Sequence, residues 1–185
     1  MPRTATILAI DPGPQQSAWI VLDPLGIPAR FGLCDNEELR DLLGTYLSPD
    51  GRWGWDEVCI EMVASYGMRV GVDVFETCVW IGRFMEATGR PARVHRIFRK
   101  RSWGGGYPGV CMAMCHNNRA KDADIRQALI DRYGGIGGRK AAIGSKASPG
   151  PLYGIGKDIW QALAVALTLR AVLPGDPAGE EADDA

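Results

Sequence analysis

One apolar run that ends in an acid and a turn constrains the fold more than any other feature. Residues 5–11 read ATILAID, and Pro12 and Gly13 follow directly. A short apolar run bounded by a turn is typical of a strand that is buried on both faces of a sheet. The strand leaves Asp11 at its carboxyl end, where ligand sites gather in α/β sheets. Asp11 is therefore the first candidate site residue.

Other apolar patterns predict the rest of an α/β fold. We expect further strands at 17–23, 27–33, 57–63 and 92–98. We expect helices at 37–47, capped by Asp35 or Asn36, and at 71–88, 119–133 and 158–173. Two segments rich in Gly and basic residues, 99–118 and 134–157, are predicted to be loops. Three strands in hairpin order, followed by strands that alternate with helices, indicate a mixed sheet.

The length of 185 residues suits one core and is too short for two large domains. We expect a single domain over 1–173 and a disordered acidic tail over 174–185. No apolar run approaches the roughly 18 residues that a membrane span needs, and the N-terminus does not have the pattern of a signal peptide. The odd set of five cysteines indicates reduced thiols. Together these features predict a cytoplasmic protein without a membrane partner.

The net charge of -1 hides a strong asymmetry along the chain. Residues 1–89 carry a net charge of -7, residues 90–157 carry +11 and residues 158–185 carry -5. A basic stretch beside acidic ones favours a polyanionic partner, most commonly nucleic acid, although a solvated basic face gives the same count.

Two further acids stand where a metal site would need them. Glu61 lies within the apolar strand 57–63, where an acid is costly to bury unless something binds it. Asp158 begins the last helix and, taken alone, is explained as a helix cap. With Asp11, however, the two supply the hard oxygen ligands that Mg²⁺ or Mn²⁺ requires. Two such ions activate a water and stabilise the leaving oxygen of a phosphodiester.

The order of these motifs resembles the RuvC-type Holliday junction resolvases of the RNase H-like, or retroviral-integrase, superfamily. The resemblance spans residues 5–173 and rests on ILAIDPG, an internal IE, AKDADIRQALIDRYG and a last helix that continues QALAVAL. It implies an RNase H-like mixed five-stranded sheet flanked by helices. It also implies a Mg²⁺- or Mn²⁺-dependent endonuclease that resolves four-way DNA junctions by paired nicks, acting as a homodimer through the helix at 71–88.

By this resemblance Asp11 and Glu61 match the first two metal-binding acids, and Asp158 matches the first member of a paired motif. The second member, an Asp in the family, is Gln161 here. Positions three apart share a helix face, so both side chains can reach one site, but an amide offers one neutral oxygen. The departure implies a site that relies on Asp158 alone, weaker metal affinity or altered activity. Lys121 matches a basic residue that contacts the scissile phosphate, although a solvated helix lysine is equally plausible.

Candidate DNA contacts lie in the basic stretch and beside Glu61. The family's stacking aromatic falls at Ala64, so we expect Tyr66 or Met68 to replace it. Basic residues interleaved with aromatics suit a phosphate-binding surface. The candidates are Arg93, Arg96, Arg99, Lys100 and Arg101 around Phe98 and Trp103, with Arg139, Lys140 and Lys146 in the second loop.

Other functions stay open at this point. The same fold also suits a nuclease for flaps, forks or RNA/DNA hybrids, and Gln161 raises the possibility of a non-catalytic binding protein with a decayed site. An actin-type ATPase needs two domains and leaves the basic stretch unexplained. Cys111, Cys115 and His116 give three candidate zinc ligands with no clear fourth, which favours a packed segment over a metal site.

Overall fold

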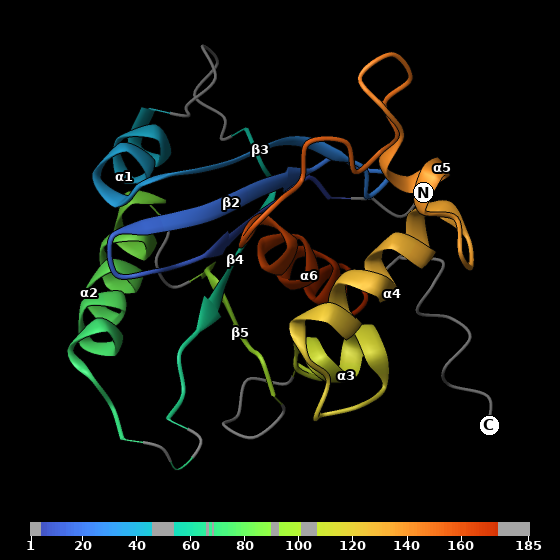
Figure 1. The fold of residues 1–185 in the computed structure, drawn as a ribbon. Helices are drawn as coiled ribbons and strands as arrows, with labels where there is room; N and C mark the ends of the chain where they lie inside the picture. The colour runs from blue at the N-terminus through green and yellow to red at the C-terminus, as the bar shows by residue number, and fades with distance from the viewer. Residues whose placement is uncertain are drawn as a thin grey trace.

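The computed structural model describes residues 5–45, 54–65, 67, 69–89, 93–100 and 107–173. Its strands are β1 (Ile7–Asp11), β2 (Gln16–Leu22), β3 (Pro28–Asp35), β4 (Glu57–Met62) and β5 (His95–Phe98). Its helices are α1 (Asn36–Thr45), α2 (Val72–Ala87), α3 (Val110–Cys115), α4 (Asp122–Gly134), α5 (Arg139–Ile143) and α6 (Ile159–Arg170) (Figure 1). None of these helices is long and apolar enough to cross a bilayer.

The five strands form one mixed sheet in the order β3-β2-β1-β4-β5. β1 pairs antiparallel with β2, and β2 pairs antiparallel with β3, while β4 runs parallel to both β1 and β5. The predicted mixed five-stranded sheet is therefore confirmed. β1 lies in the centre, where Ile7, Leu8, Ala9 and Ile10 are at most 1% exposed.

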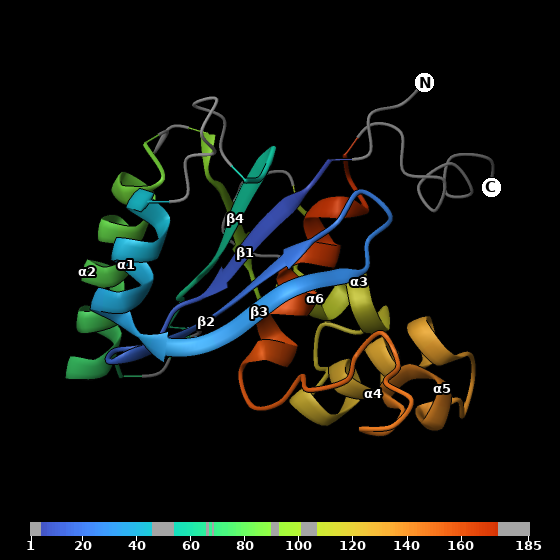
Figure 2. The ribbon, with the colours of Figure 1, turned by 90° about the horizontal axis from the view of Figure 1, so that it is seen from above.

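Helices cover both faces of the sheet, so alternate side chains of β1 enter two separate cores. Ile7 and Ala9 face a core with α6, whereas Leu8 and Ile10 face a core with α1 and α2. Figure 2 shows α1 and α2 on one side of the sheet and α3 to α6 on the other. α6 is buried along almost its whole length, which explains why its sequence is apolar on most sides.

The two predicted loops each contain a short helix, so that part of the sequence interpretation is wrong. α3 has six residues and buries Val110 and Cys111, and α5 has five residues and buries Ala142. Helices this short are not stable by propensity, because nucleation is costly, and they form here because tertiary packing holds them. The predicted tail, 174–185, lies outside the described residues, and the single-domain boundary stays a prediction.

Candidate active site

Asp11 and Glu61 are brought together by the parallel pairing of β1 and β4. Ile10 is opposite Ile60 in this pairing, so the next residue of each strand is an acid at the same end of the sheet. The two side chains lie close enough to interact, because the charge of Glu61 acts on the carboxyl group of Asp11.

The pKa values of both acids are displaced upwards. Burial raises the pKa of Asp11 well above its usual range, and the charges of Glu61 and Asp158 raise it further. Burial raises the pKa of Glu61 to about 7, with the guanidinium of Arg99 acting in the opposite direction. Without a cation, the pair thus retains a proton near neutral pH, and a bound cation would take the place of that proton.

A buried hydrogen-bond network holds the turn that follows Asp11. The Gly13 N–H donates to Ser17 Oγ at 3.1 Å, and the Asn36 amide donates to the Gly13 carbonyl at 2.9 Å. A Cβ at Gly13 would lie 2.4 Å from the carbonyl oxygen of Gln16, so only glycine fits there. The sequence pattern predicts Asn36 only as a helix cap, whereas its side chain holds this turn by a hydrogen bond.

Asp158 and Gln161 lie at the start of α6. Asp158 is at the position before the helix but forms no capping hydrogen bond with its side chain, and its charge acts on Asp11. The Gln161 amide donates from Nε2 to Asp122 Oδ1 at 3.0 Å. Its Oε1 atom is buried and has no hydrogen-bond partner among the described residues.

Asp122 is a site residue that sequence analysis missed. Its carboxylate accepts from Gln161 and also forms an ion pair with Arg99, whose charge in turn lowers the pKa of Glu61. Asp122 therefore connects Gln161 on α6 to Arg99, whose charge acts on Glu61. Residues 90–157 contain 14 basic residues and only three acids. Asp122 is one of these three acids, and this rarity is the signal in the sequence that could have identified it.

Lys121 precedes α4 and is adjacent to Asp122 in the chain, but it is exposed. Its backbone N–H donates to the Asp124 carboxylate at 2.8 Å, while within the described ranges its ammonium forms no hydrogen bond or ion pair. The structure therefore brings Lys121 to the edge of the site without contact to the acids.

An open cleft of about 380 Å³ lies between the starts of α4 and α6. It is lined by Asp122, Ala123, Arg126, Gly156, Lys157, Asp158, Trp160 and Gln161. The Arg126 guanidinium lies 5.0 Å from the centre of the Trp160 ring, a cation–π arrangement that orients the arginine. The cleft thus combines acids with two cationic side chains, as a site for a metal and a phosphate requires.

The donor chemistry fits a hard divalent cation better than a soft one. The available ligands are carboxylate oxygens and the unpaired oxygen of Gln161, which suit Mg²⁺ or Mn²⁺. In the described part of the chain, no three His, Cys, Asp or Glu side chains converge tightly enough to enclose an ion. Mg²⁺ usually keeps several waters and uses one or two carboxylates, so an open set of this kind is compatible with it.

Cys111 and Cys115 lie on α3, and His116 follows this helix. Cys111 is fully buried in the core, and its thiol donates to the Ala120 carbonyl at 3.6 Å. Cys115 is half-buried and His116 is exposed, so packing is seen for Cys111 alone, and the segment is a helix and not a loop.

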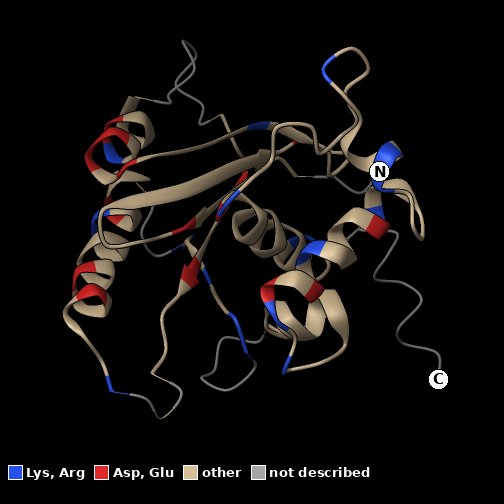
Figure 3. Cartoon of the chain, viewed as in Figure 1, with Lys and Arg blue, Asp and Glu red and all other residues tan. Residues whose placement is uncertain are grey.

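The predicted DNA contacts are only partly within the described residues. Arg96 is exposed on β5, Lys100 follows β5 and is half-buried, and Lys140 and Lys146 are exposed on and after α5. Figure 3 shows Lys and Arg at the end of β5, on α4 and α5, and in the loop after α5. Tyr66, Met68, Arg101 and Trp103 lie outside the described residues.

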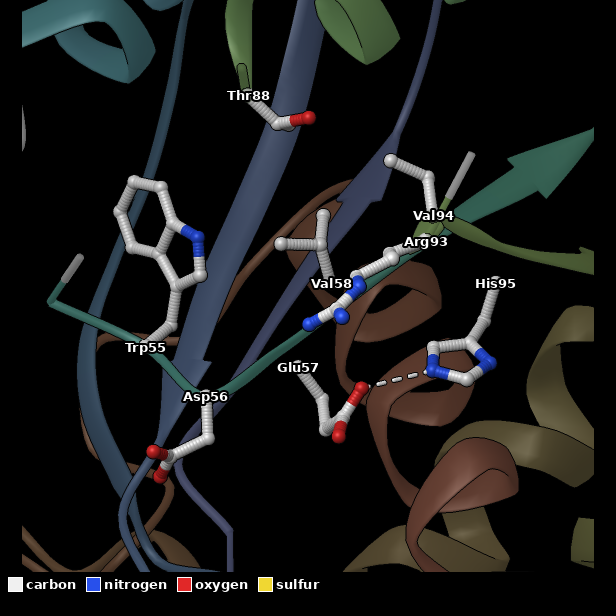
Figure 4. A pocket seen from close by; sticks show the side chains of 8 residues that line it. All are labelled: Trp55, Asp56, Glu57, Val58, Thr88, Arg93, Val94 and His95. Carbon is white, nitrogen blue, oxygen red and sulfur yellow. Dashed lines mark hydrogen bonds and ion pairs between the residues drawn. The ribbon is translucent and has the colours of Figure 1, made fainter. Parts of the chain in front are cut away.

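A second pocket, of about 290 Å³, lies at the opposite end of β4 from Glu61 (Figure 4). Glu57 and His95 face each other there at 2.8 Å, and Trp55 and Arg93 line the same pocket. Asp11, Glu61, Asp122 and Asp158 do not line this pocket, so it is separate from the candidate active site.

The fold is RNase H-like, with acids at the ends of β1 and β4. The solved structures that it matches include Thermus thermophilus RuvC, with a TM-score of 0.58 and 15% identity over 88% of this chain and 92% of that one. T. thermophilus RuvC in complex with Holliday junction substrate matches with a TM-score of 0.59 and 16% identity, over 89% of this chain and 92% of that one. No family model and no curated protein sequence matches the chain. The RuvC resemblance expected from the motifs is thus shown for the fold.

Proposed function

We propose that this protein is a Mg²⁺- or Mn²⁺-dependent endonuclease that resolves four-way DNA junctions by paired nicks. The observation that carries the proposal is the register of β1 and β4, which sets Asp11 and Glu61 at the same end of an RNase H-like sheet, with the charge of Asp158 acting on Asp11. The RuvC structure with a similar fold was solved with a Holliday junction substrate, which supports the same class of substrate here.

Asp11, Glu61, Asp158 and the carbonyl of Gln161 would hold the metal. When bound, the metal supplies an activated water and stabilises the leaving oxygen of the phosphodiester. The network of Ser17 and Asn36 keeps the turn after Asp11 in place, so that this carboxyl stays beside Glu61. Arg99 lies close enough to Glu61 to lower its pKa, and its positive charge favours the ionised form that binds a cation.

The DNA backbone would contact the basic surface around this end of the sheet. Arg126 and Lys157 line the cleft itself, so they are placed to meet the phosphates next to the scissile bond. Arg96, Lys100, Lys140 and Lys146 extend the basic surface beyond it. Lys121, exposed at the edge of the site, would reach the scissile phosphate once DNA is bound.

We also propose a homodimer through α2. Val72, Phe75 and Val79 are 72%, 63% and 48% exposed and share one face of this helix. An exposed apolar stripe of this kind is typical of an interaction surface. A two-fold dimer would supply two sites in matching geometry for the two strands of a junction.

The test compares cleavage of four-way junction, flap and linear duplex DNA with Mg²⁺ and with Mn²⁺. We expect paired nicks in the junction, and a loss of cleavage of about 100-fold or more for Asp11→Asn, because one oxygen ligand and one charge are removed. Asp41→Asn, the same change at an exposed position of α1, is the matched control and should cleave as wild type. If flaps are cut in preference to junctions, flap DNA is the substrate. If the protein binds junctions without cutting them, it is a non-catalytic binding protein.

A further inference from the structure

The Gln161 amide is held in one orientation by a residue from another helix. Its Nε2 donates to Asp122 Oδ1 at 3.0 Å, and Asp122 is 39 residues away in the chain. The reverse orientation would place two acceptor oxygens against each other. Asp122 therefore fixes which end of the amide faces inward.

The inward end is the carbonyl, and it is left without a partner among the described residues. Oε1 is buried, and a buried acceptor without a hydrogen bond costs about 1–3 kcal/mol. A cation or a metal-bound water would satisfy this oxygen. If the amide were turned, its NH2 end would take the inward position, where it could only donate and would repel a cation.

Asp122 also restores the charge that the amide lacks. The family pattern implies an Asp where this chain has Gln161, and the carboxylate of Asp122 lies within one hydrogen bond of that side chain. Asp122 lines the same cleft as Asp158 and forms an ion pair with Arg99, so its carboxylate lies within the candidate site.

We propose that Asp122 is a positioning residue that turns the Gln161 carbonyl toward the metal and supplies the negative charge missing at position 161. The proposal rests on the proposed function. It explains how a site with Gln161 can keep metal affinity, since the neutral ligand and its anionic neighbour together replace one carboxylate.

The experiment measures Mn²⁺ binding to the full chain without DNA, by the electron paramagnetic resonance of free Mn²⁺. We expect Asp122→Ala to weaken binding about 10-fold or more, as is usual when the partner of a metal ligand is removed. Asp122→Asn keeps an acceptor but loses the charge, so it should fall between Asp122→Ala and wild type. Asp41→Ala, which removes an exposed acid of α1 on the other side of the sheet, should bind as wild type.

Rescue separates positioning from a general loss of structure. A carboxylate at position 161 has two equivalent oxygens and its own charge, so it needs no orienting partner. The double variant Asp122→Ala with Gln161→Asp should therefore bind Mn²⁺ within about 3-fold of wild type, which a merely structural role of Asp122 would not allow.

The outcomes distinguish this inference from the proposed function. Suppose that wild type binds Mn²⁺ and cuts junctions. If Asp122→Ala then binds Mn²⁺ equally well, or if the double variant shows no rescue, the role of Asp122 is overturned and the proposed function stands. Wild type that neither binds Mn²⁺ nor cuts DNA overturns the proposed function, and the inference fails with it.

Discussion

The Ser17 hydroxyl donates to the side-chain oxygen of Asn36 at 2.6 Å, and the two residues are 1% and 2% exposed. Asn36 in turn donates to the Gly13 carbonyl at 2.9 Å. The contact joins the start of β2 to the start of α1 and closes around the turn that follows Asp11. The buried side chains of Ser17 and Asn36 therefore hold the turn that positions Asp11, a candidate catalytic residue.

Asn36→Ala should destabilise the protein, because it removes the acceptor of the buried Ser17 hydroxyl and the donor to the half-buried Gly13 carbonyl. We expect the free energy of unfolding to fall by about 1–3 kcal/mol in urea denaturation, with a loss of cleavage from the displaced Asp11. Asn118→Ala, at an exposed position, is the control and should change stability by less than about 0.5 kcal/mol. An equally small effect of Asn36→Ala would show that the network does not matter.

Glycine-to-alanine changes should have opposite signs at two positions. Gly13→Ala places a Cβ 2.4 Å from the Gln16 carbonyl oxygen, so the turn must shift and stability should fall by more than about 1 kcal/mol. Gly44→Ala lies in α1 with no atom within 4 Å of the added Cβ, so it should stabilise by about 0.5–1 kcal/mol. Thermal and urea unfolding of the two variants measure both effects, and the same sign for both would contradict the packing at Gly13.

The metal-free protein should lose stability as pH rises from about 5 to about 8. The pKa of Glu61 is about 7 in the fold and 4.5 ordinarily, so between these values the folded state holds a proton that the unfolded chain has released. Unfolding is then favoured progressively as pH rises, by on the order of 1–3 kcal/mol across the window.

Glu61→Gln should reduce this pH dependence, because the amide does not titrate and only the contribution of Asp11 remains. Mg²⁺ should stabilise wild type more at about pH 8 than at about pH 5, since it competes with the proton for the acidic pair. Unfolding in urea at the two pH values, with and without Mg²⁺, gives both quantities. A pH dependence that persists unchanged in Glu61→Gln would assign it to other groups.

Phe75→Glu should convert a dimer to a monomer. The side chain is 63% exposed on the apolar face of α2, so the charge would cost little in a monomer and much at a buried two-fold interface. Sedimentation velocity at micromolar concentration measures the change. Leu25→Glu, at a 79% exposed apolar residue outside α2, is the matched control and should stay dimeric. A wild-type protein that sediments as a monomer would refute the proposed interface.

The sequence by itself was sufficient to predict the strands and helices whose buried side chains recur at a regular spacing. The run that ends at Asp11 predicted β1, the helical spacing over 71–88 predicted α2, and the apolar segment after Asp158 predicted α6. These patterns are local, because a strand or helix buried against a core must place apolar side chains at its own repeat. The order of the elements was then enough to predict the mixed sheet and the RuvC resemblance.

Only the tertiary structure decided how the polar groups pair. The register of β1 and β4 sets Asp11 beside Glu61, and the packing of α4 against α6 sets Asp122 beside Gln161. Asn36 has the local sequence pattern of a helix cap. Its role in the turn was not predictable from that pattern, because the turn residue Gly13 is 23 residues away in the chain. A hydrogen bond forms only when the distance between donor and acceptor is within a few tenths of an ångström of about 2.9 Å. Packing of the whole backbone sets positions that finely, and no periodic pattern in the sequence records them.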